Sequence, residues 1–138
     1  MSRLRPILIV LIFIGICAIA IILAGTALTI PQRAEARFGP PSPNLNPLQR
    51  FRLSLALLLD AEILTTPANL AGSEQPFTIE AGNPADTVIR QLFRAGLIAD
   101  PDSFRSYLIY AGIDTRLQAG NYTLSPAMTP IEVAQSIR

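Results

Sequence analysis

The sequence predicts an α+β protein in which a single N-terminal transmembrane helix and a proline-rich segment precede a small folded module. Three observations carry this prediction. A run without any charged residue extends from Ile7 to Gln32, five prolines follow between positions 31 and 47, and regular strand and helix periodicities begin at Phe77. The chain has 138 residues and is 50% hydrophobic, but much of that content lies in the N-terminal run. The module after it therefore has only a small core to bury.

The uncharged run is long enough to cross a bilayer. Residues 6–30 would span roughly 37 Å as an α-helix, which exceeds a hydrocarbon layer of about 30 Å. A cleaved secretory signal is the alternative, since Ala34–Ala36 resembles a cleavage site, but such a signal has an apolar region of only about 7–15 residues. We therefore expect a retained transmembrane helix over 6–30, with Cys17 as an apolar side chain inside it.

Basic residues around the run predict its orientation. Two arginines and the amino terminus precede it, whereas the two arginines that follow it are partly offset by Glu35. The positive-inside rule then favours a cytoplasmic tail at residues 1–5 and a position outside the cytoplasm for everything after Pro31.

The composition excludes several classes of function. From Phe38 onward, seven arginines stand against nine acidic residues, and this net charge of −2 argues against nucleic acid as a partner, which requires clustered positive charge. The chain has no histidine and one cysteine. We therefore predict no metal site, no cofactor, no internal disulfide and no Ser-His or Cys-His nucleophile.

Residues 31–73 are predicted to form a proline-rich, extended linker that contains one apolar helix at 47–64. Asn46 is a good N-cap and Pro47 a good first helical residue. One face of this helix would carry Leu48, Phe51, Leu55, Leu58, Leu59 and Glu62. Because leucines also occupy most of its other sides, the helix needs cover from the same protein, from the membrane surface or from a partner protein.

Two strands and two helices are predicted within residues 74–138. Phe77 and Ile79 alternate with polar residues in a strand that ends at Glu80, and a second strand is predicted at 121–124. Two strands that flank two helices can pair antiparallel with both helices on one face, which is an α+β arrangement.

Capping residues bound the helices. The first runs from an N-cap at Asn83 to Gly96, and the second from an N-cap at Asp100 to Gly112. Their predicted apolar faces are Ala85, Val88, Ile89, Leu92 and Phe93 in the first, and Phe104, Tyr107, Leu108 and Ala111 in the second. A capping box at Thr129 starts a further helix, with an apolar face of Ile131, Ala134 and Ile137 that has no room to continue. We therefore expect a further domain to follow.

The motifs F-T-I-x-x-G, L-x-x-x-G-L-I, F-x-x-Y and L-x-A-G-x-Y-x-L-S-P-x-M-T occur in this order between Phe77 and Arg138. The last motif, Leu117 to Thr129, is the most specific. In these motifs the chain resembles the N-terminal region of the MltG (YceG-like) endolytic murein transglycosylases. The resemblance implies that residues 74–138 are a LysM-like βααβ module, truncated before a catalytic domain. It also implies that the complete protein is a lyase that cleaves nascent glycan strands and organises the cell wall.

The resemblance also implies sites and partners. A LysM-like module would contact glycan through the loop with Gly82 and Asn83 and through the loop that begins at Gly112, and Tyr110 is the tyrosine most free to stack on a sugar. No catalytic residue is carried over, since the family's catalytic domain has no counterpart here. The implied partners are peptidoglycan glycan strands, the lipid bilayer and cell-wall synthesis proteins, at the bacterial cytoplasmic membrane.

Two other functions compete with this one. A non-catalytic peptidoglycan-binding or scaffold protein of the cell envelope would show the same features, because no pair of acidic residues is placed convincingly around a cleft. A pyridoxal-phosphate lyase, a label sometimes given to YceG-like sequences, needs a lysine for its Schiff base. The chain has no lysine, so we reject that reading for these residues.

Overall fold

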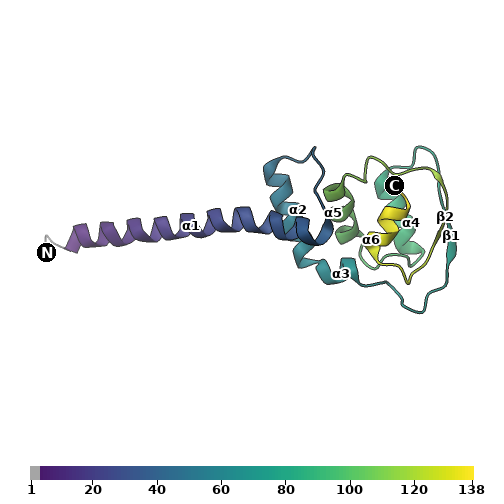
Figure 1. Ribbon diagram of the computed structural model, residues 1–138, viewed down its shortest axis with the longest axis horizontal. Helices are drawn as coiled ribbons and strands as arrows, with labels where there is room; N and C mark the ends of the chain where they lie inside the picture. The colour runs from purple at the N-terminus through teal and green to yellow at the C-terminus, as the bar shows by residue number, and fades with distance from the viewer. Residues whose placement is uncertain (1–3) are drawn as a thin grey trace.

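The computed structural model describes residues 4–138. A long helix projects from a bundle of shorter helices, and a two-stranded sheet lies at the far side of that bundle (Figure 1). The elements are α1 (Leu4–Phe38), α2 (Pro47–Leu59), α3 (Ala61–Thr65), β1 (Gln75–Ile79), α4 (Ala85–Arg94), α5 (Pro101–Ala111), β2 (Gly120–Leu124) and α6 (Pro130–Ser136). Most of the predicted cytoplasmic tail, residues 1–3, lies outside the described part.

Helix α1 is long and apolar enough to cross a membrane, and none of its most apolar window is buried within the protein. It continues beyond the predicted end at residue 30, through Pro31, to Phe38. The prediction of an extended linker from residue 31 is therefore wrong for residues 31–38. The reason is tertiary packing, since Ala34 and Phe38 are buried in the core and hold the last turns helical. The helix ends at Gly39, whose φ of +86° suits glycine.

The predicted apolar helix at 47–64 is divided into α2 and α3 by Asp60. The predicted start is confirmed. The Asn46 side chain accepts a hydrogen bond from the Gln49 N–H at 2.8 Å, and the Gln49 side chain accepts one from the Asn46 N–H at 3.1 Å. This reciprocal capping box satisfies two backbone donors at the helix start.

The buried face of α2 is not the predicted one. Ser54 and Leu57 are buried, and in α3 the buried side chains are Ala61 and Leu64. Leucines lie on nearly every side of α2, so periodicity alone could not select a face. Contacts with α1 and α5 select the Ser54 side, which confirms docking within the same protein for that face.

The sheet consists of β1 and β2 in antiparallel register, with Phe77 opposite Tyr122 and Ile79 opposite Gly120. Phe77 and Ile79 are buried as predicted. All the helices lie on one side of this strand pair (Figure 1). On the outer face, Thr78 Oγ1 donates a hydrogen bond to Asn121 Oδ1 at 2.8 Å. The α+β class is thereby confirmed.

Helix α4 begins one residue later than predicted, with Pro84 rather than Asn83 at the N-cap position. Its buried residues are Val88, Ile89 and Leu92, as predicted. Phe93, predicted on the same face, is half-exposed. The predicted end is confirmed, because Gly96 adopts a φ of +71° and Leu97 is fully buried, with its N–H bonded to the Leu92 carbonyl at 3.0 Å.

Helices α5 and α6 start at their predicted caps. Asp100 accepts a hydrogen bond from the Ser103 N–H, and Thr129 forms the capping box of α6 with Glu132. Val133, Ala134 and Ile137 are buried, and α6 packs against α3 and α5. The apolar face of this last helix is therefore not left incomplete, because it belongs to the same core as the sheet.

Candidate glycan-binding site

Both predicted glycan-contacting loops leave the sheet at the same end. Ile79, the last residue of β1, pairs with Gly120, the first residue of β2. The turn that follows β1 and the segment that precedes β2 therefore start from adjacent positions. The strand pairing brings the two loops to one edge of the module, which agrees with the LysM-like arrangement implied by the sequence resemblance. The two loops are not both accessible, however.

The turn between β1 and α4 is open. Gly82 is exposed with a φ of +85°, and a Cβ built on it would meet no heavy atom within 4 Å. The positive φ at this position favours glycine, and the missing side chain leaves free space above the turn. The N–H of Asn83 donates to the Glu80 carbonyl at 3.2 Å, and Pro84 rather than Asn83 occupies the N-cap position of α4. The side-chain amide of Asn83 can therefore serve an external hydroxyl group.

Tyr110 is not the free aromatic ring that the sequence predicted. Its relative exposure is 0%, and its hydroxyl donates a hydrogen bond to the Gly39 carbonyl at 3.1 Å. Burial raises the pKa of the Tyr110 hydroxyl, and the nearby Glu35 carboxylate adds to this shift. A fully buried ring cannot stack on a sugar. The prediction of a free ring is wrong because residues 39–46 fold back over α5, a contact that no local pattern encodes.

Gly112 makes the close backbone approach that the sequence predicted, but to the protein itself. A Cβ built on Gly112 would lie 2.9 Å from Ser42 Oγ, and the φ is +67°. Arg116 covers the same end of α5, since its Nε donates to the Gly112 carbonyl at 2.8 Å. The linker and Arg116 thus occupy the surface that a glycan would need beside Gly112.

A crevice lies between this linker and the last helices. Its volume is about 370 Å³, within the usual range of about 300–1,000 Å³ for small-ligand sites. Apolar and polar groups both line it, among them Phe38, Pro41, Tyr107, Arg116 and Gln135. Sequence reasoning missed this crevice because its walls are more than sixty positions apart in the chain and meet only when the linker folds back.

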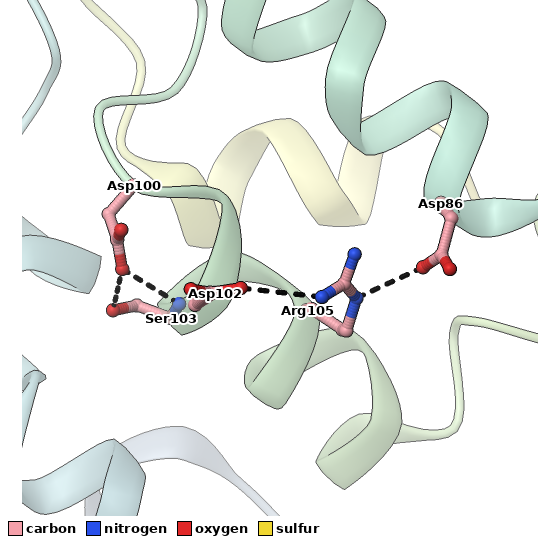
Figure 2. Close-up of polar contacts among 5 residues, drawn as sticks. All are labelled: Asp86, Asp100, Asp102, Ser103 and Arg105. Atoms are coloured by element: carbon pink, nitrogen blue, oxygen red, sulfur yellow. Dashed lines mark hydrogen bonds and ion pairs between the residues drawn. The ribbon is translucent and has the colours of Figure 1, made fainter.

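The acidic residues at the helix starts have structural partners. Arg105 bridges α4 and α5, because its Nε lies 3.0 Å from Asp86 Oδ1 and its Nη1 lies 3.3 Å from Asp102 Oδ1 (Figure 2). Asp100 accepts hydrogen bonds from both the hydroxyl and the N–H of Ser103 (Figure 2). The hydroxyl bond is the main cause that lowers the pKa of Asp100, and the N–H bond adds to it.

Two further carboxylates are engaged in the same way. Glu132 accepts a hydrogen bond from the Thr129 N–H at 2.7 Å, and this bond lowers the pKa of Glu132. Glu35 forms an ion pair with Arg50 at 2.9 Å. Within residues 7–138, no group of three or more His, Cys, Asp or Glu side chains could hold a metal ion. What this part of the molecule offers chemically is hydrogen bonding to a neutral polar ligand, chiefly at the open turn.

Comparison of the chain with protein-family models, curated proteins and solved structures finds no match. The resemblance to the MltG (YceG-like) family, and the glycan-binding roles inferred from it, stay predictions.

Proposed function

We propose that this chain is the membrane-anchored N-terminal portion of an endolytic peptidoglycan transglycosylase of the MltG (YceG-like) type, and that its α+β module is LysM-like and binds glycan. The catalytic domain of such an enzyme would lie outside these residues. In this role the chain holds nascent glycan strands close to the membrane, where a lyase domain acts on them.

One arrangement carries the proposal. The order β1–α4–α5–β2, with the strands antiparallel and the helices on one side, is the βααβ arrangement that a LysM-like module requires. It stands at the end of α1, the one helix in the described residues long and apolar enough to cross a membrane. The helix α1 ends only about 12 Å beyond residue 30, the predicted end of the membrane span. A glycan bound to the module would therefore be held close to the bilayer.

The orientation is part of the proposal. The positive-inside rule puts the amino terminus in the cytoplasm and the module outside, where peptidoglycan is found. Fusions of alkaline phosphatase and of green fluorescent protein after residue 138 test it, because the phosphatase is active only outside the cytoplasm and the fluorescent protein folds well only inside. A fluorescent fusion of green fluorescent protein together with an inactive phosphatase fusion would show that the module lies in the cytoplasm, which contradicts the proposed orientation.

Within the module, the turn at Gly82 and Asn83 supports glycan binding best. It is open, its amide side chain is not used in capping, and Thr78 and Asn121 add a hydroxyl and an amide on the adjacent outer face of the sheet. Gly112 and Tyr110 do not support glycan binding, because the linker covers Gly112 and the Tyr110 ring is fully buried.

Co-sedimentation with purified peptidoglycan sacculi tests the binding. The full chain in detergent micelles should sediment with sacculi, and Asn83→Ala should weaken this binding several-fold, about the loss expected for one hydrogen bond of 1 kcal/mol. Asn44→Ala, at an exposed position of the linker, is the matched control and should leave binding unchanged. Equal sedimentation of both variants, or none of the parent chain, contradicts the proposed site.

A non-catalytic envelope protein is the second candidate. The observation in its favour is that Glu35, Asp86, Asp100, Asp102 and Glu132 all serve ion pairs or helix caps. Sequencing of the locus beyond codon 138 separates the two candidates. A reading frame that continues into a domain with a buried glutamate supports the enzyme, whereas a stop codon directly after codon 138 supports the binding protein.

A further inference from the structure

Helix α2 exposes a row of leucines on the side that does not pack against the bundle. Leu48, Leu55 and Leu59 are 67%, 37% and 75% exposed, and their spacing of seven and four residues puts them on one face. Ser54 and Leu57, which are buried, lie on the opposite side. We call Leu48, Leu55 and Leu59 the leucine stripe.

An apolar groove adjoins this stripe. It has a volume of about 740 Å³ and lies between α1 and the start of α2. Leu23, Ala27 and Leu28 form one wall, and Leu48 and Phe51 form the other. Thr26, Gln32 and Arg50 also line the groove, and Arg50 is paired with Glu35. Most of the lining is apolar, and it joins the exposed face of α2 to the apolar surface of α1.

The position of the groove along α1 places it at the edge of a membrane. Leu23 and Leu28 belong to the uncharged run that ends at Gln32, and about 20 residues of that run suffice to cross the hydrocarbon layer. The turns that carry this groove wall therefore lie at or just inside the boundary of the acyl chains. In Figure 1, α2 runs across α1 on the side of the bundle that faces the projecting length of α1.

We propose that α2 is a second membrane-contacting element, with the leucine stripe and the groove immersed among the lipid acyl chains of the leaflet from which α1 emerges. Lipid is the occupant that the geometry favours, because the groove is continuous with the surface of α1 that lipid already covers. Arg52 lies on the same face and can extend its guanidinium to the phosphate level while its methylenes stay among apolar groups.

This contact would restrain the bundle. A single spanning helix leaves the attached domain free to rotate and tilt about the membrane normal, whereas a second contact at α2 restricts both motions. The sheet and the turn at residues 80–83 lie at the end of the bundle away from α1 (Figure 1). With α2 on the membrane, the sheet lies on the side of the bundle away from the bilayer.

Site-directed spin labelling tests the contact in the full chain. In a Cys17→Ser background, single labels at Leu55→Cys and Leu59→Cys are compared with one at Leu70→Cys, an 80% exposed position in the loop after α3. The protein is reconstituted into vesicles of phosphatidylethanolamine and phosphatidylglycerol at a fixed ratio. Labels on the stripe should collide with oxygen, which partitions into lipid, and lose most of their collisions with a water-soluble nickel chelate. The Leu70 label should show the reverse.

Two results overturn the proposal. Stripe labels with the same nickel accessibility as the Leu70 label would show that α2 lies in water. Stripe labels shielded from both oxygen and nickel, with spin–spin broadening between molecules, would show that a second copy covers the face. Circular dichroism checks that each variant keeps the parent fold. No peptidoglycan is present in this measurement, so its outcome is independent of the proposed wall binding.

Discussion

The hydroxyl of Tyr110 in α5 donates a hydrogen bond to the carbonyl of Gly39, the residue that ends the long apolar helix α1, across 71 positions of sequence. The backbone of the same tyrosine accepts a second bond, from the Ser42 N–H at 2.6 Å. These two contacts attach the linker to the bundle where an extended, proline-rich spacer was predicted. The module is therefore joined to α1 by a packed connection.

Removal of the Tyr110 hydroxyl should weaken this connection. Tyr110→Phe keeps the buried ring but leaves the Gly39 carbonyl without its partner, which should lower the free energy of unfolding by about 1 kcal/mol. Tyr122→Phe is the control, since its hydroxyl bonds to Gln118 at an exposed site where water can replace it. Urea unfolding of the full chain in detergent micelles, followed by circular dichroism, measures both. A smaller loss for Tyr110→Phe than for the control would contradict this role.

A side chain at Gly112 should separate backbone strain from contact with the linker. Gly112→Ala places a methyl group against Ser42 at a φ of +67°, whereas Gly96→Ala has a similar φ of +71° and open space. Both should lose about 1–2 kcal/mol from the left-handed backbone, and Gly112→Ala should lose more. In a Ser42→Gly background the two substitutions should cost about the same. Equal losses of stability for the two variants in the parent background would show that the Ser42 side chain moves aside without a measurable cost.

The Arg105 bridge should contribute little and should depend on salt. Its partners Asp86 and Asp102 are exposed, and exposed ion pairs contribute only about 0–1 kcal/mol. Arg105→Met should therefore cost less than about 1 kcal/mol at low salt, and this cost should shrink at high salt as the charges are screened. Arg94→Met, at an exposed position without an ion pair among the described residues, is the control. A loss at Arg105 that high salt leaves unchanged would indicate packing by its methylenes instead.

Acid should destabilise the module through its helix caps. The pKa of Asp100 is lowered in the folded protein, so the carboxylate contributes stability above the unfolded pKa of about 3.9, and this contribution is lost as the pH falls through the folded value. Glu132 acts in the same direction. Asp100→Asn keeps a good N-cap without a titrating group. The stability of this variant should therefore fall less than that of the parent protein between about pH 5 and about pH 2, the range over which carboxylates become protonated. Parallel pH profiles for parent and variant would contradict this contribution.

The sequence by itself determined the local features of this protein. Asn46, Asp100 and Thr129 cap their helices as predicted, and Gly96 and Gly112 end theirs. The alternation of Phe77 and Ile79 with polar residues placed the first strand. Each of these depends on hydrogen bonds or side-chain spacing within a few residues, so a short window of sequence contains the cause. The long apolar N-terminal helix was predictable for the same reason.

Only the tertiary structure decided the rest. The burial of Tyr110 and the crevice beneath the linker arise from the contact between residues 38–43 and α5. The extension of α1 to Phe38 and the burial of Ser54 rather than the leucine stripe arise from the packing of α2 against α1 and α5. The contact of the linker with α5 joins segments about seventy positions apart. Its free energy depends on the surfaces of both segments together, so neither segment alone predicts it. A leucine-rich helix or an isolated tyrosine gives no local signal of which side will be covered.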